Sequence, residues 1–212
     1  MSWFFTNSSK ASVKHVPKKT RYKGVLIGDG GVGKTTYHDR LTNEETKGFK
    51  VKRSYKATED HRVSELVCID KFDNTITIDL FDTAGQEKYG KLRNSYLMGA
   101  DFIIIMYDVT NRRTFDNVKK WLQNVIKLYK SCDQTPPPVV VCGNKTDLSN
   151  RYGPTELHHP RESVLRGNGY YDGNTVSYIP ISVWGDLDLW KPLDMLVQKV
   201  GNYPSDPLLV PK

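Results

Sequence analysis

Residues 28–35 read Gly28-Asp29-Gly30-Gly31-Val32-Gly33-Lys34-Thr35. This stretch fits the phosphate-binding pattern of two glycines five positions apart, followed by Lys and then Ser or Thr. The apolar run Val25–Ile27 before it predicts a buried strand, and we expect a helix to begin at Lys34. Backbone N–H groups and the helix dipole then face the phosphates, and the glycines let the backbone wrap closely around the anion. The stretch therefore predicts a strand–loop–helix unit that binds a nucleoside triphosphate.

Two side chains of this loop suit the phosphates and a metal ion. Lys34 can reach the outer phosphates as a point charge. The Thr35 hydroxyl can fill one corner of an octahedral Mg²⁺ whose other ligands are waters and phosphate oxygens. The alternative is a glycine turn that merely follows a strand.

A second motif, Asn144-Lys145-Thr146-Asp147, follows the apolar run Val139–Cys142. Its side chains are expected at the carboxyl edge of the sheet, where open α/β folds bind ligands. A carboxylate at Asp147 can accept hydrogen bonds from N1–H and the 2-amino group of guanine, neither of which adenine offers. Sites built on such hydrogen bonds reject the wrong ligand by about 10⁴-fold. The motif predicts guanine as the base, and a plain surface turn is the alternative.

A third motif, Asp82-Thr83-Ala84-Gly85-Gln86, follows the expected strand Thr75–Phe81. Asp82 can hold Mg²⁺ through a water, and the Gly85 N–H can meet a γ-phosphate. Gln86 can orient the attacking water, the role that a Gln has in GTP hydrolysis. An Asp-Thr helix cap with a glycine turn is the alternative.

With these three motifs in this order, the chain resembles a Ras-superfamily small GTPase, and it is most similar to the Ran class, which drives nuclear transport. The resemblance covers residues from about Tyr22 to Leu208. The closer match is carried by Gly28–Thr36, Asp82–Gly90, Cys142–Lys145 and Lys191–Leu193.

The resemblance implies a GTP/GDP site with Mg²⁺. Thr58 matches the switch threonine that ligates the metal in the triphosphate state, and Phe49 matches the aromatic residue that packs on the base. Catalysis is assigned to Gln86, Lys34 and Thr58, and the metal to Thr35, Thr58 and, through a water, Asp82. The expected nucleotide contacts are Asp29, Gly30, Gly31, Val32, Gly33, Lys34, Thr35, Thr36, Phe49, Thr58, Gly85, Asn144, Lys145, Asp147, Ser182, Val183 and Trp184.

The segment Ile181–Trp184 departs from the pattern, because Trp184 stands where the family usually has Lys. Val183 still offers the N–H that would meet the guanine carbonyl. We expect either weaker base affinity or stacking by the indole instead. Asp108–Asn111 and Trp121 suit the vesicle-traffic Rab class about as well as the Ran class, so a Rab-like role is the alternative.

The predicted fold class is α/β: a P-loop NTPase G domain with a six-stranded, mostly parallel sheet and helices on both faces. Its strands are expected at Lys23–Ile27, Val63–Ile69, Thr75–Phe81, Phe102–Tyr107, Val139–Cys142 and Ser177–Ile181, with helices such as Thr114–Lys130 and Leu189–Val200. Only five residues separate Val63–Ile69 from Thr75–Phe81, which predicts a hairpin and one antiparallel edge strand. We expect Pro136–Pro138 to end the helix that precedes the fifth strand. The predicted parts are a basic arm at 1–21, the G domain at 22–203 and a short tail at 204–212.

Basic residues gather at the N-terminus. Of the 31 Lys and Arg residues, six lie within residues 1–23, which hold no acid, so 25 basic and 24 acidic residues remain elsewhere. Pro17–Arg21 has the density of a nuclear-import patch or of a segment attracted to anionic surfaces, and a solvated arm is the alternative. No aromatic residues interleave with this basic stretch, so no specific nucleic-acid partner is expected.

The cysteines point to a reducing compartment, and the histidines do not predict a metal site built from Cys and His. Cys68, Cys132 and Cys142 are odd in number, and two of them fall in or beside apolar strands, as core residues do. No Cys lies near either terminus and Ser2 follows Met1, so we expect no lipid anchor and a soluble chain in cytoplasm and nucleus. His158-His159 has no second ligand pair at metal spacing.

The sequence thus predicts a GTP-hydrolysing switch of Ran-like type. No arginine of this chain can be assigned to stabilise the transition state of hydrolysis, so we expect slow turnover that depends on a GTPase-activating protein. An exchange factor and importin-type receptors are the further expected partners. The alternatives are a Rab- or Ras-like trafficking or signalling GTPase, and a guanine-nucleotide-binding scaffold with little hydrolysis.

Overall fold

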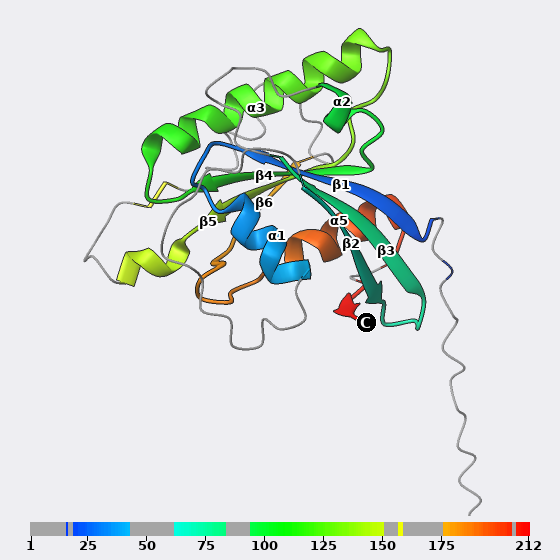
Figure 1. Ribbon diagram of the computed structural model, residues 1–212. Coiled ribbons are helices and arrows are strands. Elements are labelled where there is room, and N and C mark those ends of the chain that lie inside the picture. Colours follow the sequence, from blue (N-terminus) through cyan, green and yellow to red (C-terminus); the bar gives the residue numbers. More distant parts are fainter. Residues whose placement is uncertain are drawn as a thin grey trace, which may run out of the picture.

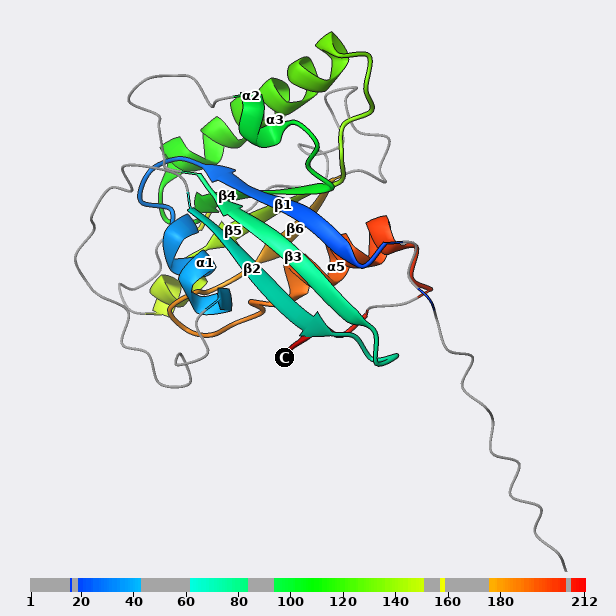
Figure 2. The same ribbon diagram turned by 45° about the vertical axis from the view of Figure 1, so that its right-hand side comes forward.

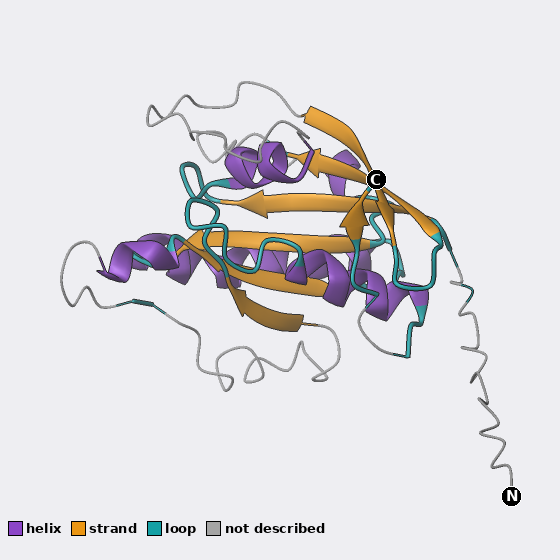
Figure 3. Cartoon of the chain, turned by 90° about the horizontal axis from the view of Figure 1, so that it is seen from below, coloured by secondary structure: helices purple, strands orange, loops and turns teal. Residues whose placement is uncertain are grey.

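The central sheet decides where every functional loop of this chain lies. The computed structural model describes residues 16, 19–42, 62–83, 94–150, 157–158, 176–204 and 207–212. The described strands are β1 (Arg21–Gly28), β2 (Arg62–Ile69), β3 (Thr75–Asp82), β4 (Phe102–Asp108), β5 (Val139–Asn144), β6 (Val176–Pro180) and β7 (Val210–Pro211). They form one sheet in the order β6-β5-β4-β1-β3-β2-β7, and Figure 3 draws its strands in orange.

The first five strands of that order are parallel, so their carboxyl ends meet at one edge (Figure 1). β4 is buried along its whole length, because it lies mid-sheet with helices on both faces. Long apolar runs are what such strands require. The phosphate-loop stretch leaves β1 at this edge, and Asn144 ends β5 there.

The prediction of six strands with one antiparallel edge strand was wrong in its count. β2 pairs antiparallel with β3 as expected, but β7 then pairs with β2 through Ile69↔Val210 and Cys68↔Pro211. The predicted C-terminal tail therefore supplies the edge of the sheet (Figure 2). Leu209 anchors it, since its side chain is buried and its N–H donates to Asp194 Oδ1 at 2.7 Å.

Helices cover both faces of the sheet (Figure 1). α1 (Lys34–Thr42) and α5 (Lys191–Gly201) lie on one face, and α2 (Asn94–Leu97) and α3 (Arg112–Ser131) lie on the other. A short 3₁₀ helix, η3 (Thr146–Asn150), follows β5. Successive β1 side chains alternate between two cores, with Leu26 in the core under α1 and α5 and Val25 in the core under α3.

The ends of α3 have local causes. Asn111 caps its start by accepting a hydrogen bond from the Arg113 N–H at 3.1 Å. The helix ends at Ser131, and Asp133 takes a left-handed conformation with φ 52°. This end comes several residues before Pro136–Pro138, so the turn at Asp133, rather than the prolines, terminates the helix.

Candidate nucleotide-binding site

The loop between β1 and α1 requires glycine at two positions. Gly28 has φ +137°, and a Cβ there would lie 2.1 Å from the Met106 carbonyl oxygen of β4. Gly33 has φ +102°, and a Cβ there would lie 2.4 Å from Asn144 Nδ2. Side chains at either position would be strained and would clash, so the loop packs tightly against β4 and β5.

Lys34 lies inside this loop with only 5% of its surface exposed. Its ammonium donates to the Gly28 carbonyl at 2.6 Å and to the Asp29 carbonyl at 2.7 Å. The charge is therefore held against the loop backbone, beside the amide groups that a phosphate would meet. Thr36 continues α1, and Gly31 has φ +74°.

Thr35 and Asp82 meet at the ends of two different elements. Thr35 Oγ1 donates to Asp82 Oδ2 at 2.7 Å, and the Asp82 side chain is fully buried with no hydrogen-bond partner on Oδ1. Burial raises the pKa of the Asp82 carboxyl above its usual range, partly offset by the Thr35 hydrogen bond. A buried, half-satisfied carboxylate beside a hydroxyl suits Mg²⁺, so these two residues fit the metal that the sequence predicts.

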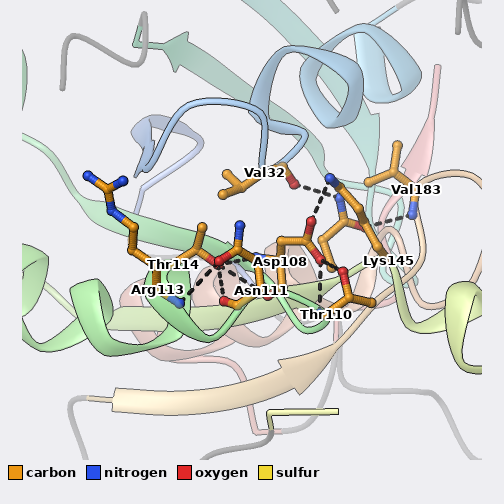
Figure 4. Close-up of polar contacts among 9 residues, drawn as sticks. Val32, Asp108, Thr110, Asn111, Arg113, Thr114, Lys145 and Val183 are labelled. Carbon is orange, nitrogen blue, oxygen red and sulfur yellow. Dashed lines mark hydrogen bonds and ion pairs between the residues drawn. The ribbon is translucent and has the colours of Figure 1, made fainter. Parts of the chain in front are cut away.

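Asn144 joins three loops at the edge of the sheet. Its Nδ2 donates to the Val32 carbonyl at 2.9 Å, and its Oδ1 accepts the Val183 N–H at 3.0 Å. Figure 4 labels the two partners, Val32 and Val183, and marks these contacts with dashed lines. One buried side chain thus fixes the phosphate loop relative to the loop after β6.

Lys145 is held by a residue that sequence reasoning did not assign to the site. Lys145 has φ +70°, and its ammonium donates to Asp108 Oδ2 at 2.7 Å. Asp108 Oδ1 accepts the Thr110 N–H at 2.9 Å and the Thr110 hydroxyl at 2.7 Å (Figure 4). A carboxylate at the end of β4 is the only sequence signal for this contact, and alone it does not name a partner.

The loop after β6 closes on itself. Ser182 and Leu187 exchange backbone hydrogen bonds of 3.1 and 3.0 Å, and Ser182 Oγ donates to Asp147 Oδ1 at 2.5 Å while accepting the Gly185 N–H at 2.7 Å. Trp184 lies at the tip of this loop, with 40% of its surface exposed. The structure therefore brings Asn144, Asp147, Ser182 and Val183 together at one place.

Some predicted residues lie outside the part of the chain that the structure describes: Phe49, Thr58, Gly85 and Gln86. Two other side chains were missed as contributors, since Asn117 and Trp121 of α3 both donate to the Asp29 carboxylate. These contacts join positions about ninety residues apart, and no local sequence pattern predicts them.

A model of the Ras family matches residues 23–200, which include the phosphate loop, the motifs Asp82–Gln86 and Asn144–Asp147, and all strands from β2 to β6. The chain belongs to the Ras family. The α/β fold with its mixed sheet agrees with a P-loop GTPase domain. Small GTPases of this family bind GTP and GDP with Mg²⁺, hydrolyse GTP and act with GTPase-activating proteins and exchange factors.

None of the helices in the described part of the chain is long and apolar enough to cross a membrane. Cys68 and Cys142 are buried and Cys132 is exposed, which confirms the expectation that two cysteines are core residues.

Proposed function

We propose that this Ras-family GTPase is a Ran-like switch that acts in nucleocytoplasmic transport. The proposal is supported by the Ran-type stretches Asp82–Gly90 and Cys142–Lys145. GTP-loaded and GDP-loaded forms then differ in the receptors that they bind. Cytoplasm and nucleus are the proposed locations.

In this mechanism Lys34 and the loop amides bind the phosphates and stabilise charge on the transferring phosphoryl group. Mg²⁺, when bound, neutralises charge on the β- and γ-phosphates, and Thr35 and Asp82 would hold it, the latter through a water, with Thr58 in the triphosphate state. The observation that carries this assignment is the Thr35–Asp82 hydrogen bond beside the unpartnered Asp82 Oδ1.

Gln86 orients the attacking water, and loss of the γ-phosphate releases Thr58 and Gly85, so the segments around these two residues relax. Asp147 selects guanine, and the Val183 N–H, which donates to Asn144 Oδ1 in this structure, is shared with the guanine carbonyl when the base is bound. Phe49 and Trp184 contribute packing against the base. Intrinsic turnover is slow, on the order of 10⁻⁴ per second without an activating protein.

The test is a binding experiment with the full chain loaded with GDP or with a non-hydrolysable GTP analogue. We expect purified importin-type receptors to bind the triphosphate form selectively. Binding that ignores the nucleotide, or none at all, would remove the Ran-like role. Firm pelleting of the chain with membranes would instead support the Rab-like alternative. A single-turnover phosphate-release assay separates both from a non-hydrolysing scaffold.

A further inference from the structure

The Asp29 side chain points to α3, away from the Lys34 ammonium that its own backbone contacts. Asn117 Nδ2 donates to Asp29 Oδ2 at 2.6 Å, and Trp121 Nε1 donates to Asp29 Oδ1 at 2.7 Å. The carboxylate is thus occupied on both oxygens, and only 9% of the residue is exposed. Hydrogen bonds to an ionised group are stronger than neutral ones.

The two donors are fixed in their roles. Asn117 Oδ1 accepts a hydrogen bond from the Lys120 ammonium at 2.9 Å. The amide nitrogen is thereby turned toward Asp29. The Trp121 indole has one N–H and no acceptor atom, so it can only donate. Asn117 and Trp121 are four residues apart on α3, so they present their donors on one side of the helix.

Asp29 therefore connects the helix to the phosphate-binding lysine. Its carboxylate is held by α3, while its carbonyl accepts the Lys34 ammonium at 2.7 Å. α3 itself is anchored, because Val118, Leu122 and Val125 are buried in the core over β1 and β4. A rigid helix thus sets the position of one residue of a glycine-rich loop.

We propose that Asn117 and Trp121 form a latch that holds the phosphate loop through Asp29 and keeps the Asp29 negative charge turned away from bound phosphates. They are positioning residues for nucleotide binding, not catalytic ones. The proposal rests on the role proposed above for residues 28–35 as the phosphate-binding loop. Releasing the latch loosens the loop and frees a carboxylate beside the site.

A freed Asp29 carboxylate should affect GTP and GDP differently. It repels phosphate charge, and GTP carries one more phosphate than GDP. Loss of the latch therefore lowers affinity for GTP more than for GDP, whereas simple loosening of α3 affects the two alike.

The test measures GDP release and the ratio of GTP to GDP affinity in the full chain with Mg²⁺. Trp121→Phe removes the indole N–H and keeps an aromatic ring. We expect GDP release about tenfold faster, a factor equivalent to ~1.4 kcal/mol, and a lower GTP/GDP affinity ratio. Trp190→Phe, at the start of α5, is the matched control and should leave both values unchanged.

Asp29→Ala removes the carboxylate that the two donors hold, so Trp121→Phe is also measured in this variant. If the latch exists, Trp121→Phe has no further effect there, and the GTP/GDP affinity ratio returns to the wild-type value. Equal acceleration by Trp121→Phe with and without Asp29→Ala would overturn the latch, as would an unchanged affinity ratio in Trp121→Phe. Failure of the wild-type chain to bind GTP would instead overturn the role of the loop itself.

Discussion

Arg40 Nη2 donates to Asp186 Oδ1 at 2.6 Å, which ties the end of α1 to the loop after β6. The Arg40 side chain is 11% exposed and that of Asp186 is 70% exposed. Trp184 stands in this loop at the position where the resemblance described above predicts a lysine. The ion pair and the Ser182–Leu187 bridge both support this loop.

Breaking this pair should speed nucleotide release, because the loop that carries Val183 would lose its tie to α1 and keep only the contact of the Val183 N–H with Asn144 Oδ1. For Asp186→Asn we expect GDP to dissociate about two- to fivefold faster, in line with ~0.5–1 kcal/mol for a pair with one exposed partner. GDP release measured with a fluorescent analogue checks this. Arg112→Gln breaks the exposed Arg112–Asp116 pair on α3 and serves as the control. Equal rates in the two variants would show that the loop does not depend on Arg40.

Sequence alone located the parts of the fold whose physics is local. β1, β4 and β5 are buried on both faces, so they appear as short apolar runs followed by polar motif residues. β7 did not appear, because a two-residue strand with a proline has no period to detect. β7 forms because the neighbouring Leu209 side chain is buried and the Leu209 N–H donates a hydrogen bond to Asp194 Oδ1.

The site divides in the same way. Gly33, Lys34 and Asn144 are fixed by backbone geometry that the motifs encode, and the structure brings them together. Asp108, Asn117 and Trp121 lack such a signal, since each acts through a contact with a residue distant in sequence. Side chains that orient others are chosen by tertiary packing, which a single sequence does not reveal.

Asp82→Asn should separate stability from metal binding. Burial raises the Asp82 pKa in the folded chain, so the folded state binds the proton more tightly than the unfolded state. The metal-free chain therefore loses stability as pH rises through the interval from the ordinary pKa to the raised one. We expect Asp82→Asn to unfold at an equal or higher temperature than wild type in EDTA at pH 7. A marked drop in Tm would contradict this.

The same variant should lose the effect of Mg²⁺ on nucleotide. In wild type, EDTA should accelerate GDP release strongly, because removing the metal leaves phosphate charge uncompensated. In Asp82→Asn, release should already be fast with Mg²⁺, and EDTA should add little. An unchanged response to EDTA would remove Asp82 from the metal site.

Asp147→Asn should change the base that is bound. One acceptor oxygen becomes a donor, so guanine loses a hydrogen bond while xanthine, with a carbonyl at position 2, gains one. GTP affinity should fall by at least about tenfold and XTP affinity should rise. Asp133→Asn, on the exposed turn after α3, is the control. Unchanged GTP binding would return Asn144–Asp147 to a surface turn.

Gln86→Leu should separate binding from turnover. The substitution removes the amide that orients water but leaves Lys34, Thr35 and Asp82 in place, so GTP binding should persist. Phosphate release should drop, most clearly in the presence of an activating protein. Gln123→Leu, on the exposed face of α3, should behave as wild type. Survival of turnover in Gln86→Leu would mean that another group positions the water.

Deletion of the N-terminal arm should alter location without altering the fold, provided that the cut respects two contacts. The Lys19 ammonium pairs with Asp101 at 2.7 Å, and Arg21 begins β1 and pairs with Asp79 at 2.7 Å. A deletion of residues 1–18 keeps both pairs, so GTP affinity should match that of the full chain. If the basic stretch acts in import, the deletion should lower the nuclear share of a fluorescently tagged chain. Equal nuclear enrichment of both forms would mean that Lys10, Lys14 and Lys18 play no part in import, and lost GTP affinity would mean that residues before Lys19 contribute to the folded domain.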